Sequence, residues 1–187
     1  MITREQALAL IEERVTNKNI IKHMVALEAT MGALCDKLGG VREEWMMAGL
    51  LHDGDYCEGV PMEKQGIEIT NWVREKGYEI PGSVAHAMAA HNWHNTKVEP
   101  ESIMDWAIFC ADSLTGLVVA CALILPDKKL SAVTPEFVLK KFGQVSFAAG
   151  TRREEIKMCE EKLGISLEEF VKITLAAMQS VSSDLGL

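Results

Sequence analysis

The chain has 187 residues, of which 48% are hydrophobic and 25% charged, and its formal net charge at pH 7 is -8. This length and hydrophobic content are sufficient for one domain with a substantial core. The acidic balance excludes a broad basic surface and argues against binding to nucleic-acid backbones, so small partners are expected instead.

Cysteine usage and the N-terminus indicate a compartment. The five cysteines are an odd number without a CxxC pair, and several stand inside apolar helical pattern. We therefore expect reduced core thiols in a cytoplasmic protein. The first residues carry both charge signs and no apolar run follows them, so they do not resemble a secretory signal. The longest apolar run, Leu117 to Leu125, falls far short of the ~20 residues that cross a bilayer, which argues against a membrane protein.

The first part of the chain predicts three helices with well-marked ends. The stretch Thr3 to Gln6 has the spacing of a capping box, which begins a short helix to about Val15. Apolar residues then recur at helical spacing from about Asn17 to Leu38, and His23 lies on this second helix. The third helix, about Val41 to His52, has almost no polar residues after Glu44, so its second half should be buried.

Proline and glycine mark the remaining helices. A fourth is expected from about Met62 to Lys76, and a fifth begins near Pro81 and carries His86 and His91. The sixth, from about Pro100 to Leu125, is long and apolar. The sequence predicts three further helix starts, at Thr134-Pro135, Thr151 to Glu154 and Ser166 to Glu169.

These segments add up to about eight or nine helices, while runs of alternating β-branched and polar residues are scarce. We expect an all-α fold, a single compact multi-helix domain over residues 1–187. Its core should cover about 17–125, with C-terminal helices over 134–183 that pack back on it. The apolar surface from Leu117 to Leu125 is either core or the face of a homodimer.

Four ionisable side chains stand in apolar helical surroundings. Asp112 lies within the apolar sixth helix, where an ionised carboxylate without a partner would be costly. His52 and Asp53 end the buried third helix, and His23 lies within the apolar pattern of the second helix, so these side chains also need polar partners. Helical bundles build metal sites from such inward side chains. The sequence therefore predicts one divalent ion held by these four residues, and it leaves Mn, Fe, Zn, Co, Ni and Mg open.

This arrangement, a helical His23, the doublet His52-Asp53 and a later Asp112, resembles the HD-domain metal-dependent phosphohydrolases. The doublet stands in the setting AGLLHD, and Asp112 follows an alanine in an apolar helix. The resemblance extends to Ala90-His-Asn92, to Ala111 through Ala120, to Lys140-Lys-Phe and to Phe147-Ala-Ala-Gly150 before Arg153. It covers most of the chain and looks like a small bacterial branch of predicted HD-superfamily hydrolases.

The resemblance implies a helical domain that binds a divalent metal through the four residues named above and hydrolyses a phosphate ester. It makes His52, Asp53 and His91 the catalytic candidates. Asp53 would bridge two ions or accept a proton from water, and His91 or His86 would bind a second ion or the developing charge. Gln65 stands where relatives often have a histidine, which weighs against a second ion.

Several residues admit two interpretations. His86 and His91 point about 140° apart on a regular helix, so only one of them can face inward, and His91 has the better position. Lys141 and Arg153 are candidates for contact with a substrate phosphate, although solvated helix faces are the stronger interpretation of both. Asp55 is either a partner of a ligand histidine or a loop carboxylate in water.

The predicted function is hydrolysis of a phosphomonoester or phosphodiester of a small substrate, nucleotide-like ones included, by metal-activated water. The alternative from another class is a non-catalytic metal-containing domain that senses a nucleotide or regulates a partner. A third interpretation is a purely structural bundle without metal. In that case Asp112→Ala would be neutral or stabilising, because an unpaired buried carboxylate is a liability.

Overall fold

The computed structural model describes residues 1–187 and contains helices but no strand. Two long helices, α2 (Lys18–Leu38) and α7 (Ile103–Leu123), pack against each other near the centre of the molecule. The other α-helices are α1 (Arg4–Arg14), α3 (Arg42–Leu51), α4 (Glu68–Glu75), α5 (Gly82–His91), α6 (Trp93–Thr96), α8 (Pro135–Phe142), α9 (Arg153–Met158), α10 (Leu167–Ser180) and α11 (Ser182–Leu185). Short 3-10 turns cover Met62–Lys64 and Leu130–Ala132, and a π-helical turn over Cys159–Leu163 continues α9.

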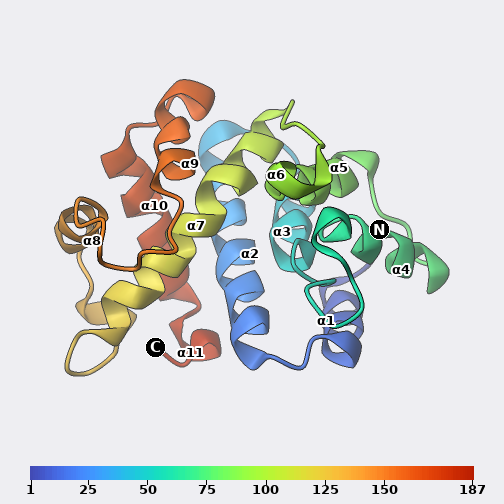
Figure 1. Ribbon diagram of the computed structural model, residues 1–187, viewed down its shortest axis with the longest axis horizontal. Coiled ribbons are helices and arrows are strands. Elements are labelled where there is room, and N and C mark those ends of the chain that lie inside the picture. Colours follow the sequence, from blue (N-terminus) through green and yellow to red (C-terminus); the bar gives the residue numbers. More distant parts are fainter.

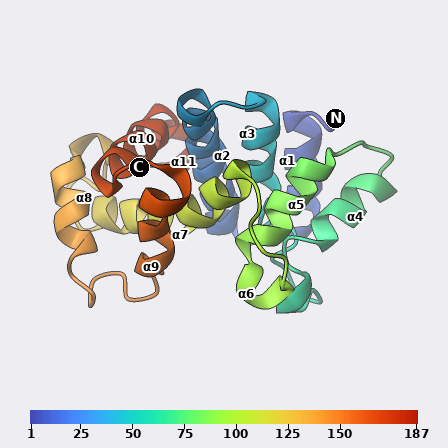
Figure 2. The ribbon, with the colours of Figure 1, turned by 90° about the horizontal axis from the view of Figure 1, so that it is seen from above.

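The central pair divides the molecule into two sides. Helices α1 and α3 to α6 lie on one side, and α8 to α11 lie on the other (Figure 1). The view from above shows the same division (Figure 2). One hydrophobic cluster of 49 buried residues includes members from both sides, so the two halves share a core. The predicted all-α single-domain fold is confirmed.

The core helix α7 is more apolar than its longest uninterrupted run indicated. By length and composition it is the one helix that could cross a membrane, with a mean hydropathy of 1.8 over its most apolar window. However, 61% of that window is buried inside the protein, which is the position of a core helix. Of the run that was expected to be core or a dimer face, Leu117, Val118, Cys121 and Ala122 are buried in the core, whereas Leu123 and Ile124 at its end are exposed.

Two contacts fix the position of α2. The guanidinium of Arg4 on α1 donates to both carboxylate oxygens of the buried Glu28 on α2, at 2.7 and 3.0 Å. In the same part of α2, α3 approaches at Gly49, where a Cβ atom would lie only 2.7 Å from the carbonyl oxygen of Leu27. Only glycine permits this approach of two helix backbones, which matters because both helices carry residues of the candidate site.

Some helix boundaries differ from those expected. The capping box at Thr3 and Gln6 is present, and Ser166 accepts from the backbone of Glu169. The expected helix from Met62 to Lys76 is wrong in its first part: a 3-10 turn ends at Lys64, Gly66 has a φ of +87°, and α4 begins only at Glu68. The expected capping box at Thr151 is also absent, and α9 begins at Arg153 without a side-chain cap.

Candidate metal centre

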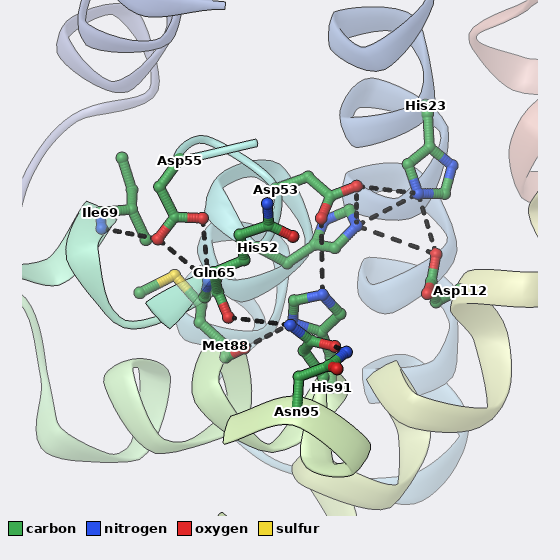
Figure 3. Close-up of polar contacts among 12 residues, drawn as sticks. His23, His52, Asp53, Asp55, Gln65, Ile69, Met88, His91, Asn95 and Asp112 are labelled. Carbon is green, nitrogen blue, oxygen red and sulfur yellow. Dashed lines mark hydrogen bonds and ion pairs between the residues drawn. The ribbon is translucent and has the colours of Figure 1, made fainter. Parts of the chain in front are cut away.

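The four predicted ligands lie together, although they come from three parts of the chain (Figure 3). His23 lies on α2 and Asp112 on α7, and their Nε2 and Oδ1 atoms are 2.9 Å apart. His52 and Asp53 come directly after α3, which ends at Leu51. Nε2 of His52 lies 3.1 Å from Nε2 of His23 and 3.4 Å from Oδ2 of Asp53.

His91, the last residue of α5, completes the cluster. Its Nε2 lies 3.5 Å from Oδ1 of Asp53, and its ring stands edge-on to that of His52. Two overlapping triads therefore have ligand atoms within 4.8 Å of one another: His23, His52 and Asp112 form the first, and His52, Asp53 and His91 form the second. Because both use His52, whose Nε2 offers a single lone pair, the arrangement fits one shared ion better than two separate ions.

The turn after α3 allows the adjacent His52 and Asp53 to converge. Neighbouring side chains on a regular helix point about 100° apart. Here the helix ends, and the amide of Gly54 donates to the carbonyl of Leu51 at 2.9 Å to close a tight turn. A Cβ atom on Gly54 would lie 2.8 Å from Cδ1 of Ile69, so the turn packs closely on α4.

Backbone carbonyls orient two of the imidazoles. Nδ1 of the fully buried His52 donates to the carbonyl of Gly49 at 2.9 Å, and Nδ1 of His91 donates to the carbonyl of Met88. These bonds place the Nδ1 proton away from the centre and direct Nε2 into it. This is the usual orientation of histidines that bind a metal through Nε2.

A hydroxyl group orients the third imidazole. Oγ1 of Thr115 donates its proton to the carbonyl of Asp112 at 2.8 Å and lies 3.1 Å from Nδ1 of His23, so it accepts from that nitrogen. The Nε2 atoms of His23 and His52 thus face each other at 3.1 Å, each with its proton on the other nitrogen in the neutral ring. Two facing lone pairs repel, so a shared cation, either a proton or a metal ion, is required between them.

The acidities of these groups reflect the need for a cation. Burial favours neutral forms, but the hydrogen bond and charge of His23 outweigh it and lower the pKa of Asp112 to about 2. The charge of His52, and hydrogen bonds from His52 and His91, likewise hold the pKa of Asp53 well below its usual range despite burial. Against the effect of burial, the bond to Asp53 and the nearby carboxylates raise the pKa of His91 to about 9. The pKa of His23 is raised in the same way, chiefly by Asp112 against the opposing effect of burial.

The donor set fits a divalent transition metal. Two carboxylates and three imidazoles combine anionic oxygen with neutral nitrogen, a mixture that suits Mn, Fe, Co, Ni or Zn better than a calcium cage of oxygens. Without an ion, protons on the histidines must balance the two buried carboxylates. A divalent ion can replace those protons, which is why metal binding at such sites releases protons.

The centre opens to the surface beside α7. His52 and His91 are buried, whereas the exposed fractions of the side chains of His23, Asp53 and Asp112 are 23%, 18% and 22%. A shallow depression of about 360 Å³, here called the trough, leads to two of these residues. It is lined by His23, Asp112, Ser113, Gly116 and the segment 148–151. A small anion can therefore reach the centre from solvent.

Three other predicted site residues do not join the centre. His86 instead lies 2.9 Å from the buried Asp105 through its Nδ1, as expected from its turn of about 140° from His91. Lys141 stacks over the ring of Phe147 and donates to Gln144 at 3.1 Å. Neither His86 nor Lys141 belongs to either triad, and both side chains have partners elsewhere.

Arg153 also belongs to neither triad. Its guanidinium donates to backbone carbonyls of the preceding loop, those of Phe142, Gln144, Phe147, Ala148 and Thr151. Its donors are thus already used within the protein, and the side chain holds the loop that forms one wall of the trough. A phosphate could be bound only at the expense of these bonds.

Two loop residues, Asp55 and Gln65, also lie outside the two triads. Asp55 is fully buried and accepts from the amides of Gly66, at 2.8 and 2.9 Å, and Ile69, at 2.9 Å, so it neither touches a ligand histidine nor faces water. Burial raises the pKa of Asp55 even though these amides favour the ionised form. Gln65 donates weakly to the carbonyl of Val60, at 3.4 Å, and belongs to neither triad.

Thr115 is the participant that sequence reasoning missed. It is fully buried and stands three residues after Asp112, on the adjoining turn of α7. A polar residue three positions from a predicted ligand in an apolar helix could have indicated such a partner.

Comparison with known proteins adds no relative. No protein-family model, no curated protein and no solved structure matches the chain.

Proposed function

We propose that the protein is a metal-dependent phosphohydrolase of the HD-domain type that acts on a small phosphate ester in the cytoplasm. The observation that carries the proposal is the pair of triads that share His52 and together bring three Nε2 atoms and two carboxylates into one cluster, with each Nδ1 held by an oxygen. The arrangement agrees with the order of ligands that the sequence resemblance implies. The trough gives the centre the access that a substrate needs.

A divalent ion, when bound, supplies Lewis acidity that polarises a phosphoryl oxygen and acidifies a water molecule. His23, His52, Asp53 and Asp112 would hold the ion. Asp53, whose two oxygens face His52 and His91 respectively, is placed to accept the proton of the attacking water through its second oxygen. His91, whose Nε2 lies 3.5 Å from Oδ1 of Asp53, is placed beside that carboxylate to stabilise negative charge on the phosphoryl group.

The test is metal content followed by turnover. Elemental analysis of the untagged protein should give about one equivalent of transition metal after incubation with Mn, Fe, Co, Ni or Zn. Asp53→Ala should lose most of it, whereas Asp127→Ala, which changes an exposed carboxylate elsewhere, should retain it. The loaded protein should then hydrolyse some members of a panel of phosphate monoesters and diesters. Absence of metal from the parent under all conditions would refute the proposal.

A second candidate is a metal-containing domain that senses a nucleotide or regulates a partner without turnover. Gln65 favours this candidate. Its side chain does not reach the centre, so the remaining ligands suffice for only one ion. Retained metal and nucleotide binding, without hydrolysis of any ester, would support this candidate.

A chelator experiment separates both candidates from a purely structural bundle. If an ion occupies the centre, its removal should lower the melting temperature, since binding stabilises the folded state. Asp112→Ala should then remove the response to chelator. In a metal-free bundle, chelator would not change the melting temperature of the parent, and Asp112→Ala would lower it, because the substitution removes the partner of His23 at 2.9 Å.

A further inference from the structure

We infer that the substrate of this centre carries an apolar alkyl or aryl group, which binds in a cavity between α2, α7 and α11. The inference rests on the proposed function for the position of the phosphate, and adds to it the chemical class of the remainder of the substrate. The cavity has a volume of about 450 Å³, within the ordinary range for small-molecule sites. Its lining includes Lys22, His23, Gly116, Val119, Leu123 and Leu185.

The apolar cavity is continuous with the candidate metal centre. His23 and Gly116 line both the cavity and the trough, so the two depressions meet at these residues. His23 is also 2.9 Å from Asp112 within the centre. A phosphate bound in the trough therefore has a direct route for its ester group into the cavity.

One face of α7 forms the route. Asp112, Gly116, Val119 and Leu123 are spaced four, three and four residues apart, which places them on one stripe of the helix. At ~1.5 Å per residue, Gly116 lies about 6 Å and Leu123 about 16 Å along the axis from Asp112. The stripe begins with a predicted ligand, passes through a residue without a side chain and becomes apolar, which matches a phosphate followed by a hydrocarbon chain.

Gly116 keeps the passage open. It is exposed in the middle of α7, where glycine costs helix stability, yet its φ is ordinary and a Cβ atom placed on it would meet no atom within 4 Å. Neither backbone conformation nor helix packing therefore requires glycine here. An added side chain would project into the space shared by the trough and the cavity.

The chemistry of the cavity favours an apolar group over a nucleoside. Val119, Leu123 and Leu185 supply apolar surface, and Leu123 remains 49% exposed in the free protein, so a ligand would remove it from water. Lys22 adds a single cation to the lining, and its Nζ lies close to Gly186, next to α11. The apolar surface on α7 and α11 favours an alkyl or aryl group on the phosphate.

The experiment measures binding without turnover. Affinities of ethyl-, butyl-, hexyl- and octylphosphonate for the metal-loaded protein are determined by titration calorimetry, with adenosine monophosphate for comparison. Phosphonates resist hydrolysis, so the measurement does not depend on catalysis. Affinity should rise about two- to fourfold for each added methylene until the cavity is full. An affinity independent of chain length, or absence of phosphonate binding, would overturn the inference.

Two variants test the place of binding. Leu123→Asp should abolish the increase from hexyl- to octylphosphonate, since only the longest chain approaches this residue, whereas Ile124→Asp, at the neighbouring position that is 51% exposed and outside the cavity lining, should preserve the whole series. Gly116→Leu fills the passage and should exclude the longer chains. An unchanged series in both Leu123→Asp and Gly116→Leu would contradict this location.

Failure of the inference can be told apart from failure of the proposed function. A chain-length dependence without hydrolysis of the corresponding alkyl phosphates would support the cavity and contradict the phosphohydrolase. Hydrolysis of ethyl phosphate, together with a phosphonate affinity that does not depend on chain length, would support the phosphohydrolase and contradict the apolar cavity. Tighter binding of adenosine monophosphate than of octylphosphonate would assign the site to nucleotides and contradict the apolar substrate class.

Discussion

Oγ1 of Thr115 lies 3.1 Å from Nδ1 of His23, and its own proton is donated to the carbonyl of Asp112, three residues earlier on the same helix. The hydroxyl can therefore only accept from His23. It fixes the ring so that Nε2 faces Asp112 at 2.9 Å and connects two candidate ligands from α2 and α7. Thr115 acts as a positioning residue and does not itself reach the centre.

Replacement of Thr115 by valine keeps the shape of the side chain and removes the acceptor. Metal affinity should fall by about 10- to 100-fold, the usual cost of losing such a partner of a ligand histidine. Competition with a chromophoric chelator measures the change. Thr115→Ser should restore most of the affinity, and an equal affinity in the valine variant would show that the bond has no part in metal binding.

The close contact of α2 with α3 predicts opposite effects for two glycine-to-alanine substitutions. Gly49→Ala should destabilise the protein by about 1–3 kcal/mol, because the new Cβ atom would lie 2.7 Å from the carbonyl oxygen of Leu27 and force the helices apart. It should also weaken metal binding, since these helices carry His23 and His52. Gly116→Ala meets no atom and should stabilise α7 by about 0.5–1 kcal/mol. Urea denaturation compares the two variants, and equal effects would contradict the helix contact.

The raised pKa of His91 predicts how the stability of the metal-free protein depends on pH. The pKa is about 9 in the folded protein and about 6.5 in an unfolded chain, so the protonated ring favours folding. This stabilisation is complete below about pH 6.5 and is lost as the pH rises through about 9. Denaturation at several pH values in the presence of a chelator should therefore show a decline over this interval.

The same series with bound metal provides the control. A divalent ion disfavours the proton on His91, so the decline should be smaller. In His91→Gln the decline should become clearly smaller even without metal, because only the contribution of His23, whose pKa is also raised, remains. A decline of equal size in the variant would assign the pH dependence to other groups.

Asp55 predicts a loss of stability that comes from hydrogen bonds to the backbone. Asp55→Asn replaces a carboxylate oxygen that accepts amides of Gly66 and Ile69 with an NH2 group in one position. The free energy of unfolding should fall by about 1–3 kcal/mol. Asp127→Asn, at an exposed site, should change it by less than about 0.5 kcal/mol. A neutral Asp55→Asn would mean that the loop keeps its structure without the carboxylate.

The sequence predicted the parts of the fold that depend on periodic apolar residues. The long helices around His23 and Asp112 have strong apolar patterns, and the bounds expected for α2 agree with the structure within a residue. The four ligand candidates were recognised because a charge in such a pattern requires a partner. Their convergence on one point follows from helix packing and could not be calculated from spacing alone.

The features that were missed depend on contacts between distant segments. Nothing near Asp55 in the sequence identifies Gly66 and Ile69 as its donors, and the start of α4 was misplaced for that reason. For Arg153 a solvated helix face was the stronger expectation and contact with phosphate the alternative, because an exposed cation and one that binds loop carbonyls have the same local sequence. Thr115 is recognisable only when Nδ1 of His23 is seen beside it.

The hydrogen bonds of Arg153 to loop carbonyls allow the sequence of this loop to change during evolution. The segment from Gly143 to Arg152 forms turns but no helix or strand, so one guanidinium takes the place of the ladder that would otherwise satisfy its carbonyls. Carbonyl groups are present whatever the side chains are, so residues 148–151, which wall the trough, can vary while the attachment persists. Related proteins with a different trough could thus arise by exchange of this loop alone, with the helical scaffold and the His/Asp cluster inherited unchanged.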